Sequence, residues 1–241
     1  MNKETQGGLF FLGLFIAIGL ALAGYFIGQT LYNSKVALNT AEVKGLAERR
    51  VKADRVNWSI GFNVAGPDKE EIPRLYNLAE QHQGLIRNIL EENGFTDDEI
   101  HVGVLDYNYV EYRDQDQALV DESHLLSGVI SVESGKVELV SKVRSKVNKL
   151  ISEGINIENR DPTYRFTGLN AIKPDMLSEA TKNARIAANE FAKNANVCVG
   201  GIQSARQGNF FIRDAGEEYG DTAKIEKDVR VVTTITFYLK D

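Results

Sequence analysis

The sequence predicts an α+β protein with antiparallel or mixed β-sheets, three amphipathic helices packed on them, and one transmembrane helix before them. Three observations support this fold class. An uncharged apolar stretch occupies the N-terminus, hydrophobic patterns of period two and of period three to four follow it, and paired strand patterns separate the helical ones.

The N-terminal stretch is long enough to cross a membrane. Residues 5–34 have no charged side chain, and residues 7–31 are mostly Leu, Ile, Phe, Ala and Gly. At about 1.5 Å per residue, such a helix spans a hydrocarbon core of about 30 Å. The sequence thus predicts a tail over residues 1–6, an anchor over 7–31 and a linker over 32–41. A cleaved signal peptide is the alternative, because Ala21-Leu22-Ala23 is a small-x-small sequence, but the apolar run continues beyond it.

Two further features concern this helix. Gly24 and Gly28 form a small-xxx-small pair, which makes them candidates for a contact between membrane helices. Lys3 precedes the anchor, whereas Lys35, Lys44 and two arginines follow it. Counted alone, these charges slightly favour a cytoplasmic domain by the positive-inside rule.

Residues 42–241 contain the folded part, predicted as one domain. Strand patterns cover residues 42–65, 100–112, 125–132, 155–168, 202–212 and 229–239. Helical patterns cover residues 72–93 and 140–151, and a third helix opens at Lys173-Pro174-Asp175. Its predicted buried stripe is Leu177, Ala180, Ala184, Ala187, Ala188, Phe191 and Ala195. A polar loop is expected over residues 113–122.

The composition excludes several classes of function. Hydrophobic residues make up 43% and charged residues 26%, so the chain has the composition of a folded protein. The net charge is −6 and there is no basic block, which argues against nucleic acid as a partner. Cys198 is the single cysteine, so neither an intrachain disulfide nor a cysteine-based zinc site is possible. Between two valines, Cys198 is predicted to be buried.

No motif predicts a catalytic residue, a cofactor or a metal. His82, His101 and His124 lack the spacing of a metal-ligand pair, and His82 is expected at the core boundary of its helix. The acidic residues 114–122 lack the glycine and the twelfth-position glutamate of a calcium loop. Nucleophile-elbow, Walker and dinucleotide motifs are also missing from the sequence. The basic residues of the second helix are expected on an exposed face.

Three tyrosines form the candidate interaction surface. Tyr107, Tyr109 and Tyr112 lie in one predicted strand. Aromatic side chains are enriched at protein interfaces, which favours a binding surface. The alternative is that they cover the core or a subunit contact, as aromatic residues on strands commonly do.

Several segments resemble the SIMPL domain (DUF541) family, over roughly residues 42–241. The resemblance rests on the strand ending at residues 63–65 before Pro67-Asp68, on the closing hairpin, and on three phrases. These are Leu90-Glu91-Glu92-Asn93-Gly94-Phe95, then Asp97-Asp98-Glu99-Ile100 before the tyrosine strand, and the Ala-rich helix running into Val199-Gly200-Gly201-Ile202. The chain departs from the family at residues 194–200, where a Leu-Gly-x-x-Leu-Gly ending is usual.

The resemblance implies an extracytoplasmic domain in a bacterial envelope, without known enzymatic activity, and with the anchor we expect it on the bacterial inner membrane. It also implies large homo-oligomeric rings and a link to envelope or oxidative stress, and it outweighs the charge asymmetry around the anchor. The leading hypothesis is therefore a single-pass scaffold whose partners are further copies of itself, the membrane and other envelope proteins. The alternatives are a binding module that uses the tyrosines and the acidic residues 214–221, and, least favoured, a hydrolase with an unfamiliar site.

Overall fold

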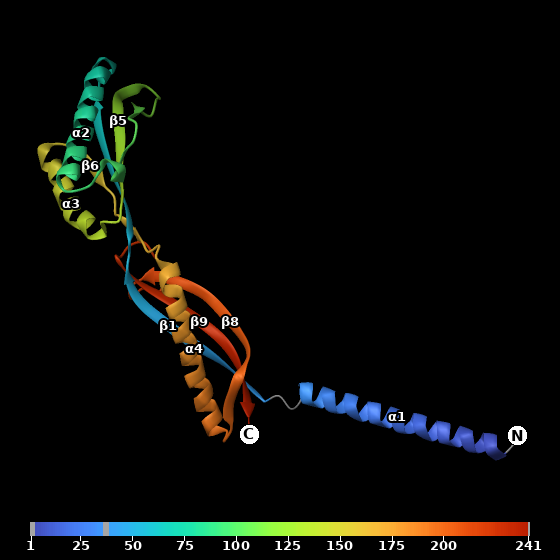
Figure 1. Cartoon of the computed structure of the whole chain (residues 1–241). Helices are drawn as coiled ribbons and strands as arrows, with labels where there is room; N and C mark the ends of the chain where they lie inside the picture. The colour runs from blue at the N-terminus through green and yellow to red at the C-terminus, as the bar shows by residue number, and fades with distance from the viewer. Residues whose placement is uncertain (1–2, 36–38, 241) are drawn as a thin grey trace. The chain divides into compact units, whose positions relative to one another are not determined.

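The computed structural model describes residues 3–35 and 39–240, with side chains for residues 12–32 and 39–240 (Figure 1). The helices are α1 (Lys3–Lys35), α2 (Ile72–Glu92), α3 (Val137–Lys149) and α4 (Leu169–Asn194), with short 3-10 turns at Lys69–Glu71, Asp97–Glu99 and Leu150–Glu153. The strands are β1 (Thr40–Lys52), β2 (Arg55–Gly66), β3 (Ile100–Val102), β4 (Asp106–Arg113), β5 (Leu119–Ser134), β6 (Asn156–Asn159), β7 (Thr163–Arg165), β8 (Cys198–Asp214) and β9 (Glu226–Lys240). The predicted α+β class with antiparallel sheets is confirmed.

Helix α1 is apolar and long. Its segment Leu12–Tyr32 has the length and composition to cross a membrane, and a signal sequence passes the same test. Of the predicted linker, residues 32–35 continue the helix and residues 40–41 begin β1, while residues 36–38 lie outside the described residues. Of the predicted tail, residues 3–6 are helical and residues 1–2 lie outside the description.

The chain divides into two compact units, each built from separate segments. Unit 1 consists of Met1–Ala47, Leu177–Asn209 and Val231–Asp241, and unit 2 consists of Glu48–Met176 and Phe210–Arg230. Strands β1, β8 and β9 and helix α4 each contribute residues to both units.

Unit 2 contains a six-stranded sheet of order β3-β5-β2-β6, with β4 paired to β5 and β7 paired to β2. The second half of the strand pattern predicted over residues 42–65 forms β2, whose even-numbered residues from Val56 to Val64 are all buried. Antiparallel pairing places Trp58 opposite Val132 and Ile60 opposite Ile130, so both strands present apolar side chains to the same face.

Helices α2 and α3 pack on that face (Figure 1). On α2 the buried residues are Leu75, Ala79, Ile86 and Leu90, which identifies Ile86 rather than Leu85 as the core residue. On α3 they are Val137, Val140, Val143 and Val147. Gly154 follows with φ of 88°, a left-handed conformation that ends the helical region where the sequence predicts. On the opposite face of the sheet, called the open face below, β2 presents the polar residues Asn57, Ser59 and Asn63.

Unit 1 consists of the sheet β1-β9-β8 with α4 on one face (Figure 1). Strand β9 is central, and every second residue from Val231 to Phe237, within the strand predicted over residues 229–239, is buried. On one side of β9, Leu239 N–H donates to the carbonyl of Asn39, just before β1, at 2.7 Å. On the other side of β9, Ser204 Oγ of β8 donates to Thr236 Oγ1 at 3.1 Å. Strands β1 and β8 are therefore the two edges.

The buried stripe of α4 differs from the predicted one. Phe191 is 62% exposed and Ala195 is exposed, whereas Ala192 is buried, so the stripe recurs every four residues: Ala180, Ala184, Ala188 and Ala192. The physical reason is the close approach of α4 to β1. A Cβ added to Gly45 would lie 1.9 Å from the Ala180 carbonyl oxygen, which leaves room only for small side chains along this contact.

Two predicted boundaries are also wrong. Helix α4 begins at Leu169 rather than Lys173, and Pro174 lies inside it. Leu169 and Ile172 are half-buried, so packing retains a helical turn before the proline despite the missing N–H. The loop predicted over residues 113–122 is shorter, because the polar residues Glu111 and Glu122 pair in the β4–β5 ladder. A backbone ladder needs no apolar side chain, and hydropathy does not reveal it.

Candidate functional site

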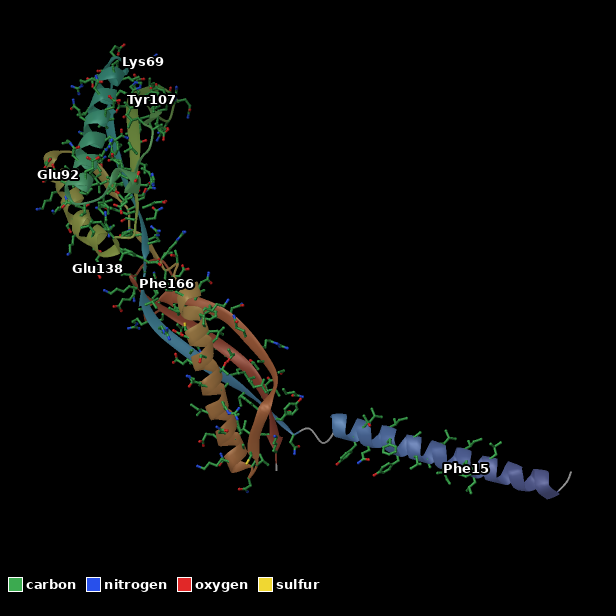
Figure 2. All side chains as sticks on the ribbon, in the orientation of Figure 1. Phe15, Lys69, Glu92, Tyr107, Glu138 and Phe166 are labelled. Carbon is green, nitrogen blue, oxygen red and sulfur yellow. The ribbon has the colours of Figure 1, made fainter. Side chains whose placement is uncertain are left out.

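The three predicted tyrosines lie on β4, but only two of them share a face. Tyr107, labelled in Figure 2, pairs with Leu126 in the β4–β5 ladder. Tyr109 pairs with His124, and because it lies two residues after Tyr107, both tyrosines face the same way. Tyr112 pairs with Asp121, and strand alternation puts it on the other face. The structure thus brings together Tyr107 and Tyr109, which are 48% and 44% exposed, and separates Tyr112 from them.

His124 lies under the two tyrosines and was missed as a site residue. It is only 2% exposed, and its Nδ1 shares a hydrogen bond of 2.7 Å with the Tyr107 hydroxyl. The Tyr109 and Tyr107 rings stack on it, with centroids 5.1 and 6.0 Å away. The sequence held the signal, because His124 continues the period-two series of buried positions Leu126, Ile130 and Val132.

The far side of the imidazole lacks a hydrogen bond. Nε2 of His124 is buried without a partner among the described residues, and Glu122 Oε1 is 3.7 Å away. Tyr109 donates its hydroxyl proton to Glu122 Oε2 at 2.7 Å. This bond, together with burial and the negative charge of Glu122, raises the pKa of Tyr109 to about 12. Tyr109 is therefore neutral at physiological pH and serves as a hydrogen-bond donor.

A second site, the polar pocket, lies on the open face of the unit 2 sheet. Its volume is about 340 Å³. The polar residues that line it come from β2, β3, β5, β7 and neighbouring turns: Arg55, Asn57, Asp98, His101, Glu133, Ser134, Thr163, Arg165 and Thr167. Cross-strand pairing organises them, since Asn57 pairs with both Glu133 and Thr163, and Arg55 pairs with Arg165.

Hydrogen bonds hold the walls of the polar pocket. Asn57 Nδ2 donates to Glu133 Oε1 at 2.9 Å. The carboxylate of Asp54 accepts from the Thr167 N–H and hydroxyl, at 2.8 and 2.9 Å, which fastens the segment after β7. Arg55 and Arg165 are different, because neither guanidinium has a hydrogen bond or an ion pair within the described part of the chain.

The turn that carries Asp98 is fixed by a capping box. Thr96 N–H donates to Glu99 Oε2 at 2.9 Å, and Ser134 Oγ donates to Glu99 Oε1 at 2.6 Å. Lys136 Nζ is 2.7 Å from Glu99 Oε2. Although burial raises the pKa of Glu99, the hydrogen bonds from Lys136, Ser134 and Thr96 outweigh it and lower this pKa to about 2. Glu99 is thus ionised and structural, and it positions the neighbouring Asp98 at the pocket.

The remaining predicted site residues are dispersed. Gly24 and Gly28 are exposed on α1, with open space where a side chain would stand. His82 is half-buried, as predicted, and burial lowers its pKa. His101 lies in the polar pocket. Cys198 is exposed, so the prediction that it is buried is wrong: as the first residue of an edge strand it has a neighbouring strand on one side only.

The acidic residues 214–221 and the basic helix α3 each contain a charged side chain that is paired with another residue of the protein. In the acidic residues 214–221, Asp214 is buried against Lys227, which leaves Glu217 and Glu218 exposed. On the basic helix α3, Arg144 is paired with Asp161 at 2.8 Å. Across residues 3–35 and 39–240, no three His, Cys, Asp or Glu side chains converge to hold a metal ion.

Fold and sites together define a class: an α+β protein that begins with an apolar helix and presents aromatic and polar surface sites on an antiparallel sheet. The profile of the SIMPL family, described as a protein of unknown function (DUF541), matches residues 41–237. The chain belongs to this family, as its sequence resemblance indicated. No curated protein matches the chain.

Proposed function

We propose that the chain is a membrane-anchored envelope protein that self-assembles into a homo-oligomeric ring or cage. The observation that carries the proposal is the unpaired edge of β8. One edge of β8 pairs with β9, and no described strand pairs with the other edge of β8. The link to envelope or oxidative stress rests on the family resemblance alone.

The edge of β8 has few of the features that prevent pairing between proteins. Natural edge strands are commonly short or protected by Lys, Pro or bulges, since unpaired backbone groups are a template for another strand. Residues 198–209 of β8 contain no Lys or Pro, and Arg206 is their single charged residue. Ile202 is 48% exposed.

The opposite edge of the same sheet offers a different surface. On β1, Glu42 and Lys44 are exposed, and the Leu46 carbonyl already accepts from Asn183 Nδ2 at 2.7 Å. Pairing of β8 in one copy with β1 in the next is a head-to-tail contact. Such contacts generate rings when the rotation between copies closes.

Lysines on the edge of β8 are expected to break the assembly. We expect the full-length protein in detergent to have the mass of a large oligomer, and the variant Gln203→Lys/Ala205→Lys to have a much smaller mass, because pairing would bury the added charges. Size-exclusion chromatography with light scattering measures this.

The matched control is Ser178→Lys/Asn189→Lys, which adds the same charge at exposed positions of α4 and should leave the mass unchanged. A monomeric wild-type protein at micromolar concentration would contradict assembly. An unchanged mass of the β8 variant would remove that edge from the contact.

The location we propose is the bacterial inner membrane, with α1 as a single span and the folded part outside the cytoplasm. The exposed Cys198 is a natural probe of this orientation. A membrane-impermeant maleimide is expected to label Cys198 in intact spheroplasts as strongly as in permeabilised ones.

A second probe guards against masking of Cys198 by assembly. Tyr219 is 85% exposed, so Cys198→Ser/Tyr219→Cys moves the thiol to an open position. Labelling of this variant only after permeabilisation would place the domain in the cytoplasm and refute the proposed orientation. Recovery of the labelled chain from the soluble fraction would show that α1 is removed as a signal sequence.

A binding module that recruits another envelope protein is the second candidate function. The specific observation in its favour is the pair Tyr107 and Tyr109, exposed on the β4–β5 ribbon and stacked on the buried His124. Aromatic side chains held rigidly by their neighbours lose little conformational entropy on binding. Pull-down from membranes with Tyr107→Ala/Tyr109→Ala tests it, and Tyr112→Ala on the opposite face is the control.

A further inference from the structure

We propose that the polar pocket binds a small ligand that carries one oxyanion, a carboxylate or a phosphate, and whose remainder is neutral or cationic. Arg55 and Arg165 bind the oxyanion. This inference goes beyond the proposed function, because neither assembly through β8 nor a protein contact at the tyrosines requires the polar pocket.

The two arginines lie side by side without a counter-charge. Arg55 on β2 is directly opposite Arg165 on β7. Directly opposed residues of an antiparallel pair have Cβ atoms about 4.5–5.5 Å apart, and like charges in such positions repel. Neither guanidinium is hydrogen-bonded or ion-paired within residues 3–35 and 39–240. The arrangement is unfavourable for the empty protein and favourable for an anion between them.

Seven other arginines of unit 2 have a carboxylate partner, whereas Arg213 and Arg230, like Arg55 and Arg165, have none among the described residues. Arg55 and Arg165 differ from Arg213 and Arg230 because they lie directly opposite each other and line the polar pocket. Carboxylates within 4.0 Å accompany Arg49, Arg50, Arg74, Arg87, Arg113, Arg144 and Arg160. Arg55 and Arg165 lack such a partner among the described residues, although Asp54 precedes Arg55 in the chain. The Asp54 carboxylate is directed instead to the N–H and hydroxyl of Thr167. The nearest acid along the chain therefore stabilises the pocket wall and does not pair with Arg55.

The hydrogen-bond donors in this part of the polar pocket suit a bound oxyanion. A guanidinium presents parallel N–H groups that match the two oxygens of a carboxylate or phosphate. Thr163 lies two residues before Arg165 on β7, on the same face of the sheet. Its hydroxyl makes only a long hydrogen bond, 3.4 Å to the Asn57 carbonyl. If the hydroxyl exchanges this long bond for one to a ligand, it becomes a further donor.

The other side of the polar pocket is acidic and limits the charge of the ligand. This side is lined by Glu133 on β5, by His101 on β3 and by Asp98 on the turn just before β3. A second negative charge on the ligand would meet these carboxylates, whereas a neutral or ammonium group would not. The volume of about 340 Å³ is near the lower end for small-molecule sites. Polyanions are thus excluded, and a zwitterion fits the charge pattern best.

The test is NMR spectroscopy of the full-length protein in detergent, labelled with ¹⁵N-arginine, at low ionic strength. The probes are β-alanine for the carboxylate and glycerophosphoethanolamine, a phosphodiester with a single negative charge, for the phosphate, with ethanolamine as a probe that lacks the oxyanion. We expect saturable shifts of the Arg55 and Arg165 Nε–Hε signals with at least one of the two zwitterions, at a dissociation constant on the order of 1 mM. Ethanolamine should cause none.

Substitutions decide whether the two arginines are the ligands. Arg165→Gln and, separately, Arg55→Gln should each weaken binding about tenfold or more, since each removes charge-assisted hydrogen bonds. Arg160→Gln, whose arginine pairs with Glu158 outside the polar pocket, is the matched control and should bind like the wild type.

A thermal readout separates binding from a structural role. Because Arg55 and Arg165 repel each other, either Gln variant should unfold at the same temperature as the wild type or higher, while losing the stabilisation that the zwitterion confers. Absence of saturable shifts with both zwitterions would overturn the proposal. So would retention of wild-type affinity in both Gln variants, or equal binding of ethanolamine.

Discussion

Gly45→Val is expected to lower the free energy of unfolding of unit 1 by about 3 kcal/mol or more. A Cβ at this position would lie 1.9 Å from the Ala180 carbonyl oxygen, 2.6 Å from the Ala184 nitrogen and 2.8 Å from the Ala184 Cβ. Two of these atoms are backbone, so relief requires α4 to move away from β1. That movement would also loosen Val43, Ile235 and Phe237, which share the same cluster.

Urea unfolding followed by circular dichroism measures the loss, and hydrogen exchange of residues 40–47 and 231–240 localises it. Gly201→Ala is the control, since open space surrounds the added Cβ in β8. Its stability should change by less than about 0.5 kcal/mol. If Gly45→Val were as stable as this control, the close packing of α4 on β1 would be refuted.

Asp214→Ala is expected to destabilise unit 2 by about 3–5 kcal/mol. Lys227 is completely buried, and its ammonium bonds to the Asp214 carboxylate and to the Asp221 carbonyl, the latter at 2.8 Å. Asp214 also accepts from the N–H groups of Ala223 and Lys224, at 2.9 and 3.0 Å. The substitution leaves a buried ammonium without its counter-charge and a loop without its acceptor.

The double variant Asp214→Leu/Lys227→Met is the informative control. Apolar residues of similar volume remove both charges together, and such replacements are often neutral or stabilising. We expect the double variant to be more stable than Asp214→Ala. Fluorescence of Trp58, the single tryptophan, reports unfolding of unit 2 because Trp58 is fully buried there. Equal stability of the two variants would mean that the loss comes from the loop hydrogen bonds rather than from the buried charge.

The Asp214–Lys227 ion pair should also make the stability of the protein depend on pH in the acidic range. Burial raises the pKa of Asp214, but Lys227 and the two backbone N–H groups outweigh it, so the folded-state pKa is lowered. A lowered carboxyl pKa contributes stability above the unfolded value of about 3.9, and this contribution is lost as the pH falls through the folded-state pKa. The wild type should therefore lose stability below about pH 4, and Asp214→Asn should lose less over the same range.

Local patterns predicted the elements of this fold well. The alternation in β2 and β9 and the spacing in α2 and α3 each reflect one buried face, which a short stretch of sequence records directly. The pattern failed at Phe191, where hydrophobicity suggested burial. What decides its exposure is the distance between α4 and β1, set by Gly45 far away in the sequence.

The candidate sites were less predictable for a similar reason. Tyr107 and Tyr109 were found from their strand, but the separation of Tyr112 follows from the register with β5. Arg55 and Arg165 meet only because β7 pairs with β2. Neither arginine has a local motif, and the feature that distinguishes them, direct opposition in the polar pocket without a counter-charge, exists only in the folded chain.

The central position of β9 in the sheet β1-β9-β8 has a consequence for biosynthesis. Translation yields β1 well before β9, so β1 emerges from the ribosome long before its neighbour exists. At about 5–20 residues per second, the interval is roughly 10–40 s. Helix α1 emerges before β1, and unit 1 completes its sheet only after β9 has left the ribosome.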